Sequence, residues 1–176
     1  ISRGKIETSE KGSEFLTKIT DEPFEVLSYE QKEGNESHPQ LFDLTSLQVE
    51  CNKRFGFSAE ETLNMTQGLY EKKLVTYPRV DTTYLSDDIY PKVEDILSKL
   101  AHYKTYTTPL LGKKIRKSKR VFDDKKVTDH HAIIPTGITP SGITPNEQKV
   151  YDAITRRFIS VFYPDCKVSI KVVDGQ

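Results

Sequence analysis

Long hydrophobic runs, cysteine clusters and a net charge are all missing from this chain of 176 residues. No apolar stretch approaches the ~20 residues of a membrane-spanning helix, so we expect no membrane partner. The two cysteines, Cys51 and Cys166, lie far apart and have no metal-ligand spacing. We interpret them as structural thiols of a reducing cytoplasm, and the sequence leaves a disulfide between them open.

Positive and negative charges balance, because 26 lysines and arginines face 26 aspartates and glutamates. A dedicated nucleic-acid-binding protein usually carries a basic excess, so the overall charge alone does not indicate one. The distribution is uneven, however, since residues 113–126 hold eight basic residues against two acidic ones. Such a run is most often a solvated face, and the alternative is contact with a phosphate backbone.

The most informative segment is Val75–Leu85, in which Tyr77 stands two residues before Arg79 with a proline between them. Pro78 disfavours a helical conformation for the residue before it, and side chains two apart on an extended backbone point the same way. A phenol has an ordinary pKa near ~10, so it needs a nearby cation or base to react at neutral pH. Because a guanidinium suits a phosphate, the pair indicates phosphoryl transfer through a phosphotyrosine. The simpler alternative to a catalytic site is that this segment is the end of a strand and that its arginine faces solvent.

Helix signals dominate the middle and later parts of the chain. We predict helices over 9–19, 46–54, 59–72, 87–100 and 145–162, with Thr45 and Ser58 as caps and Gly56 as a helix stop. Helix, short turn, helix over 45–72 is the outline of a helix-turn-helix unit. Strands are predicted at 24–29, at 74–77 and from 166 onward, and a loop is predicted at 33–39. Because the last strand needs a sheet partner, we expect a piece of a larger protein.

Two adjacent histidines, His130 and His131, follow Asp129. They would lie on opposite faces of an extended chain. A metal site is one interpretation, but no third or fourth ligand has suitable spacing, and a lone histidine is most often structural. In a phosphoryl-transfer site a histidine can instead hydrogen-bond the scissile phosphate or pass a proton through an acid.

Three ordered motifs resemble those of type IA DNA topoisomerases. Pro39–Ala59 resembles the stretch before their active site, Leu74–Asp81 resembles their catalytic-tyrosine motif, and Arg120–Thr136 resembles their downstream histidine motif. The YPR and HHAIIPT forms are most similar to those of bacterial topoisomerase III. Three motifs in the right order are far more specific than any one of them.

The resemblance implies a role for each matching residue. Tyr77 would attack a phosphodiester of single-stranded DNA and form a 5′-phosphotyrosine link, while Arg79 would hold the scissile phosphate and stabilise the transition state. His130 would be the active-site histidine, with His131 and Asp81 in supporting positions. The break would be resealed without ATP after another strand has passed through it.

The same resemblance implies a mixed α/β (α+β) fold. Residues 37–162 would form a helix-rich catalytic-tyrosine domain like a winged helix, and 1–36 and 163–176 would be incomplete parts of a β-rich arch domain. The expected partners are DNA, preferably single-stranded, and the rest of the same polypeptide, in a bacterial cytoplasm beside the nucleoid. The candidate DNA contacts lie in the basic run and are Lys117, Lys119, Arg120 and Lys125.

The family's magnesium site has no counterpart in this sequence. That site is an acidic cluster of the Asp-x-Asp-x-Glu kind with a separate glutamate near the leaving oxygen, and the pairs at 87–88 and 123–124 lack its spacing. We therefore expect Mg²⁺ to bind outside this chain.

Other function classes fit less well. A non-catalytic module that binds single-stranded nucleic acid would use Tyr77 to stack on a base and the basic run to contact phosphates. A relaxase would need a three-histidine metal site, and a tyrosine recombinase would need a wider set of arginines and histidines. Neither of these last two patterns is present in the sequence.

The chain by itself is expected to fold without cleaving DNA, because the acidic cluster is missing. Incubation with a labelled single-stranded oligonucleotide and Mg²⁺ should give no protein–DNA adduct on a denaturing gel. An adduct that disappears in Tyr77→Phe would contradict this expectation.

Overall fold

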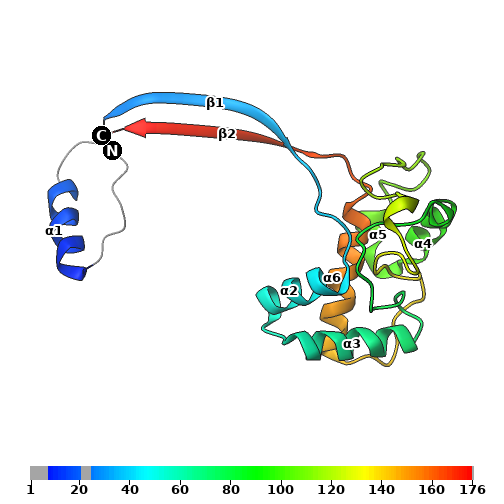
Figure 1. Ribbon diagram of the computed structural model, residues 1–176. Coiled ribbons are helices and arrows are strands. Elements are labelled where there is room, and N and C mark those ends of the chain that lie inside the picture. The colour runs from blue at the N-terminus through cyan, green and yellow to red at the C-terminus, as the bar shows by residue number, and fades with distance from the viewer. Residues whose placement is uncertain (1–7, 21–24, 176) are drawn as a thin grey trace. The chain divides into compact units, whose positions relative to one another are not determined.

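The computed structural model describes residues 8–20 and 25–175, and it divides the chain into two units (Figure 1). One unit contains Ser37–Cys166, and the other contains the segments on either side of it. Helices and a small sheet are both present, which confirms the mixed α+β class. The assignment of the outer segments to an arch domain stays a prediction. Within the described ranges, none of the helices is both long enough and apolar enough to cross a membrane.

The outer segments form one helix and a two-stranded sheet. Helix α1 (Ser9–Thr20) precedes β1 (Val26–Glu36), which pairs with β2 (Cys166–Gly175) (Figure 1). The Ser28 hydroxyl donates a hydrogen bond to the Asp174 carboxylate at 3.0 Å. The predicted start of the last strand near residue 166 is therefore confirmed.

The predicted loop at 33–39 is wrong in its first half, because β1 continues to Glu36. Gly34 lies opposite β2, and a Cβ built on it would meet the side chains of Val168 and Ile170 at 3.5 and 3.8 Å. Pairing with β2 thus outweighs the low strand propensity of this polar, glycine-containing stretch.

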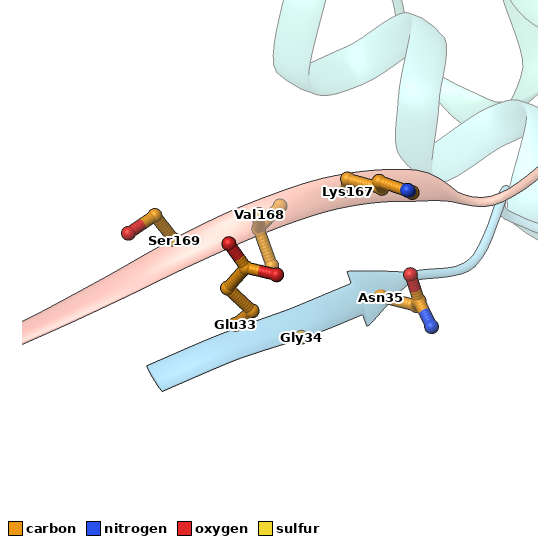
Figure 2. Close-up of a pocket in the computed structure, with 6 residues that line it drawn as sticks. All are labelled: Glu33, Gly34, Asn35, Lys167, Val168 and Ser169. Atoms are coloured by element: carbon orange, nitrogen blue, oxygen red, sulfur yellow. The ribbon is translucent and has the colours of Figure 1, made fainter. Parts of the chain in front are cut away.

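A hollow of about 420 Å³ lies along this pair of strands (Figure 2). Its lining contains one acidic and one basic side chain and none of the predicted site residues. The lining residues are Glu33, Gly34, Asn35, Lys167, Val168 and Ser169.

The second unit is mainly helical and contains the hydrophobic core. Its α-helices are α2 (Leu44–Phe55), α3 (Ala59–Glu71), α4 (Val93–Lys99), α5 (Lys104–Thr107) and α6 (Pro145–Ser160), and its 3-10 helices are η1 (Asp87–Lys92), η2 (Ala101–Tyr103) and η3 (Asp124–Lys126). Helices α2, α3 and α6 pack against one another, and their inward faces are fully buried. Leu47, Leu69 and Phe158 represent these three helices in the core, each with no exposed surface.

The predicted helix-turn-helix over 45–72 is present as α2 and α3. Gly56 ends α2 in the left-handed region with φ of 73°, which is a favourable conformation for glycine. Ser58 and Glu61 form the expected capping box of α3. The cap of α2 is Asp43 and not Thr45, because the Asp43 carboxylate accepts the backbone N–H of Ser46 at 2.7 Å.

Two other predicted elements are shorter than expected. The helix predicted over 87–100 begins as η1 and becomes α4 only after Pro91, which has no backbone N–H to donate to a helical bond. The strand predicted at 74–77 is a single antiparallel bridge between Val75 and Pro135. Pro78 has no backbone N–H for the next hydrogen-bonded position that a longer ladder would need.

Glu147 joins the start of α6 to the end of α3. Its carboxylate accepts the backbone N–H of Thr144 at 2.7 Å and pairs with the Lys72 ammonium at 2.8 Å. These two interactions, the Lys72 bond first, hold the pKa of Glu147 below the ordinary glutamate range. A Cβ on Gly68 would lie 2.9 Å from the Glu147 carboxylate, so glycine at this position lets the helices approach.

Substitution Glu147→Ala should lower the free energy of unfolding by about 1–2 kcal/mol, because it removes a cap and leaves Lys72 unpaired. Since the pKa is depressed, this stabilisation is present above the ordinary glutamate pKa of ~4.3 and is lost as the pH falls below it. Urea unfolding at neutral and acidic pH measures both effects. Glu94→Ala on the exposed side of α4 is the control, and an equal loss in both variants would contradict the assigned role.

Candidate active site

Backbone pairing between two distant segments brings Tyr77 to His130. The Thr76 N–H donates to the Ile134 carbonyl at 3.0 Å, and the Ile134 N–H donates to the Thr76 hydroxyl at 2.9 Å. Tyr77 directly follows the first segment, and its ring lies against the His130 ring with the centroids 4.5 Å apart and the planes inclined by 41°. Two residues that are 53 positions apart in the sequence thus share one contact.

The Tyr77 ring is held on two sides. Tyr70 at the end of α3 meets it edge-on, with the ring centroids 5.5 Å apart and an angle of 78°. Tyr77 is half-buried against the hydrophobic core, and Pro78 after it is buried. The ring is therefore fixed by packing, and the phenol lies at the boundary between core and surface.

Arg79 and His130 line the same groove, which has a volume of about 730 Å³. Both side chains are exposed, and Arg79 makes no ion pair with any residue in the described part of the chain. Its guanidinium therefore remains available to an anion. The groove is also lined by Asp43, Leu44, Thr45, Val80, Asp81, Thr128 and Asp129.

Tyr77 itself is not part of the groove lining and contacts the groove through His130. The structure thus brings Arg79, Asp81 and His130 together in one groove. Tyr77 lies outside the lining and packs on the His130 ring. The arrangement provides a cation, a histidine and a phenol in one neighbourhood, which are groups that a phosphoryl transfer to tyrosine can use.

The acidic side chains in the groove do not form a metal site. Over residues 8–20 and 25–175, no three histidine, cysteine, aspartate or glutamate side chains are grouped as metal ligands. The Asp43 carboxylate is already occupied, because it caps α2. The residues present therefore do not fit a magnesium ion.

His131 faces the protein and not the groove. It is half-buried, and its Nδ1 lies 2.8 Å from the Ala132 carbonyl, so Nδ1 is the atom that donates. Burial lowers the pKa of His131 below the ordinary histidine value. The neutral form of the ring is therefore favoured, and its Nδ1–H bonds the carbonyl of the next residue along the chain.

The predicted DNA contacts are dispersed. Lys117 pairs with Asp87 at 2.9 Å and lies 5.5 Å from the Tyr90 ring centroid, so its charge is partly neutralised. The Arg120 guanidinium reaches the His38 carbonyl at 3.5 Å. Lys119 and Lys125 are exposed.

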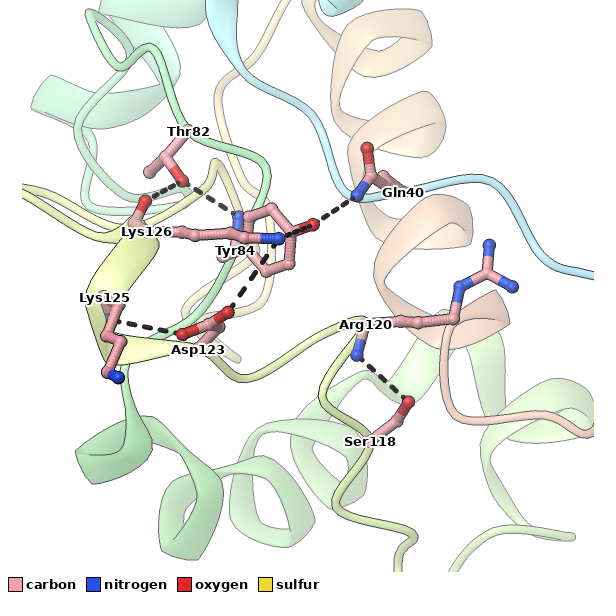
Figure 3. Close-up of polar contacts among 8 residues, drawn as sticks. All are labelled: Gln40, Thr82, Tyr84, Ser118, Arg120, Asp123, Lys125 and Lys126. Carbon is pink, nitrogen blue, oxygen red and sulfur yellow. Dashed lines mark hydrogen bonds and ion pairs between the residues drawn. The ribbon is translucent and has the colours of Figure 1, made fainter.

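Sequence reasoning missed a cluster around Tyr84 (Figure 3). The Lys126 ammonium donates to the Tyr84 hydroxyl at 2.9 Å and lies 4.3 Å from its ring centroid. The Gln40 amide donates to the same hydroxyl at 3.0 Å, and the Thr82 hydroxyl holds the Lys126 carbonyl at 2.6 Å. Lys126 belongs to the basic run, which is a usable signal, but nothing in the sequence connects Tyr84 with Gln40.

The free energy of unfolding should fall between about pH 7 and pH 5. A histidine with a depressed folded pKa stabilises the protein above its unfolded value of ~6.5 and loses that contribution as the pH falls through it. His131→Gln should therefore show a smaller loss in urea unfolding at the two pH values. His102→Gln, at an exposed histidine, should keep the full loss, and identical curves for the two variants would disprove the assignment to His131.

Comparisons with known proteins show the family of this chain. A family model described as DNA topoisomerase matches residues 1–176. DNA topoisomerase 3 of Bacillus cereus is 42% identical over 144 residues, covering 79% of this chain and 20% of that protein. DNA topoisomerase 3 of Bacillus subtilis is 47% identical over 131 residues, covering 72% of this chain and 18% of that protein.

A solved structure has the same fold. Full-length topoisomerase I from Thermotoga maritima superposes with a TM-score of 0.61 at 22% identity, covering 97% of this chain and 27% of that one. The chain spans about a fifth of the length of the curated relatives named above. On the family match over its whole length, the chain belongs to the type IA DNA topoisomerases that its three motifs indicated.

Proposed function

We propose that this chain carries the nucleophile of a reaction that breaks and reseals one DNA strand. Tyr77 forms a 5′-phosphotyrosine link, another strand passes through the break, and the first strand is then rejoined. The observation that carries the proposal is the packing of the Tyr77 ring on His130, which lines one groove with Arg79. Membership of the topoisomerase family supports a change in DNA topology as the outcome.

The chemistry is a transesterification that conserves its bonds. The Tyr77 oxygen attacks the phosphorus and loses its proton, while the bond from phosphorus to the 3′ oxygen breaks and that oxygen gains a proton. One phosphate ester replaces another, so resealing is the reverse step and consumes no ATP. The balance needs no co-reactant beyond proton transfer.

Arg79 and His130 act on the phosphate in this proposal. Arg79 can donate two parallel hydrogen bonds to phosphate oxygens and oppose the charge that grows in the transition state. His130 lies between Tyr77 and the groove, so it can hydrogen-bond the phosphate or relay the phenol proton. Asp81 orients neighbouring groups in the same groove, and His131 positions His130.

In this proposal the metal ion, and the other protein parts that open the DNA strand, lie outside the described residues. The described residues do not fit Mg²⁺. We propose, as the resemblance to the family implies, that it binds in another part of a longer polypeptide, and we derive no step through it. The preferred DNA is single-stranded, as the resemblance to the family implies. The expected location is the bacterial cytoplasm beside the nucleoid.

Substitution of the nucleophile tests the proposal in the longer parent protein. Tyr77→Phe should abolish both covalent adducts and relaxation of supercoiled DNA while binding to an oligonucleotide remains, because the ring keeps its packing. Tyr70→Phe is the matched control, since this neighbouring tyrosine touches Tyr77 and should keep its activity. Relaxation by Tyr77→Phe at the parent rate would show that the nucleophile is assigned wrongly.

The same variants separate the enzyme from a non-catalytic DNA-binding module. A module that only stacks Tyr77 on a base would behave identically with phenylalanine at that position. It would form no adduct in any variant, including the unmodified parent. Adduct formation by the parent therefore decides between the two functions.

A further inference from the structure

A second groove in the helical unit is strongly basic. It has a volume of about 470 Å³, and Lys113, Lys114, Arg116 and Arg120 line it together with a single acidic residue, Asp165. The first three basic side chains are exposed. The groove shares no lining residue with the groove of Arg79 and His130. The zero net charge of the chain is therefore compatible with a locally basic groove.

The second groove also offers apolar surface. Its lining includes Leu110, Ile115 and Phe162 from the core and its edge, and the exposed ring of Tyr163. Basic side chains beside apolar and aromatic ones are the combination that binds single strands, because phosphates and bases are both accommodated. A duplex keeps its bases stacked inside and would use only the charges.

Two chain segments connect the two grooves. His38 lines the second groove, and the groove of Arg79 begins five residues later at Asp43. An extended chain spans at most ~3.6 Å per residue, so these two positions are no more than ~18 Å apart. The other connecting segment begins at Arg120 in the second groove and reaches the groove of Arg79 eight residues later at Thr128.

The Tyr84 cluster lies on both connections (Figure 3). Gln40 comes from the first segment and Lys126 from the second, and both donate to the Tyr84 hydroxyl. A tyrosine hydroxyl that accepts two hydrogen bonds keeps its own proton free to donate, and here it does so beside the Lys126 ammonium, which also lies 3.9 Å from the Asp123 carboxylate. The Lys126 bond also lowers the pKa of Tyr84, which makes the hydroxyl a better donor to a phosphate oxygen.

We propose that the two grooves and the Tyr84–Lys126 pair form one continuous track for a DNA single strand. The groove of Arg79 and His130 takes the scissile phosphate, the Tyr84 hydroxyl and Lys126 take a phosphate between the grooves, and the second groove holds the strand several nucleotides away. The identity of the scissile position rests on the proposed function, whereas the track requires binding alone. The track keeps hold of the strand at a distance from Tyr77.

Binding of thymidine oligonucleotides to this chain tests the track. Fluorescence anisotropy over lengths of about 4 to 16 nucleotides should show affinity that rises until both grooves are filled. A triple variant, Lys113→Ala, Lys114→Ala and Arg116→Ala, should lose most of this gain and keep the affinity for the shortest oligonucleotide. Between about 50 and 200 mM salt its log–log slope should fall by about 2, since each lost contact to a single strand contributes ~0.7.

The control is Lys53→Ala. Lys53 is an exposed lysine near the end of α2, far along this helix from Thr45. Its substitution should change neither the affinity nor the salt slope. Lys126→Met should weaken binding of the longer oligonucleotides while keeping the aliphatic stem over Tyr84. Equal length dependence and equal salt slopes in the triple variant and the unmodified chain would refute the track. Urea unfolding confirms that each variant is folded, and a variant that unfolds is replaced by its single substitutions.

The track and the nucleophile fail in different experiments. If Tyr77→Phe abolishes adducts in the parent while the triple variant binds long oligonucleotides normally, the track is wrong and the proposed function stands. If the triple variant loses length-dependent binding while Tyr77→Phe still forms adducts, the track stands and the nucleophile assignment is wrong.

Discussion

The pairing of Leu74–Thr76 with Ile134–Thr136 is the contact on which the candidate site depends. The Val75–Pro135 bridge is flanked by two backbone bonds, from the Thr76 N–H to the Ile134 carbonyl and from the Thr136 N–H to the Leu74 carbonyl, and threonine hydroxyls complete the bonding. Thr76 donates its hydroxyl to the Ala132 carbonyl at 3.2 Å, and Thr136 donates its hydroxyl to the Lys73 carbonyl at 2.6 Å. Lys73 adopts a positive φ of 60°, a conformation that costs a non-glycine residue ~1–2 kcal/mol. The Thr136 bond helps to hold this turn. The turn lies directly before the segment that leads to Tyr77.

The rest of the site follows from that pairing. Once the two segments are joined, Tyr77 lies at the end of one and His130 just before the other. The exposed Arg79 and His130 then border one groove, while the half-buried Tyr77 packs against the core. A reactive surface is thus supported by residues of the same short segments that face inward.

Charge placement explains how a neutral chain can belong to a DNA-acting family. Many of the acidic side chains are engaged within the protein, as shown by Asp43 at the cap of α2 and Glu147 between α3 and α6. Several basic side chains of the 113–126 run instead line an open groove. The field near that groove is therefore positive even though the sum over the chain is zero.

Local sequence signals were sufficient to predict several helices of this protein. The capping box at Ser58, the glycine stop at 56 and the helical periodicity of α2, α3 and α6 act within a few residues, so sequence alone located these helices. The three motifs likewise indicated the family and the candidate residues Tyr77, Arg79 and His130. The tertiary structure alone decided that β1 continues through Gly34, that Tyr77 packs on His130, and that Tyr84 meets Gln40 and Lys126. The physical reason is that these contacts join residues tens of positions apart, and packing and backbone pairing select them only when the whole chain has folded.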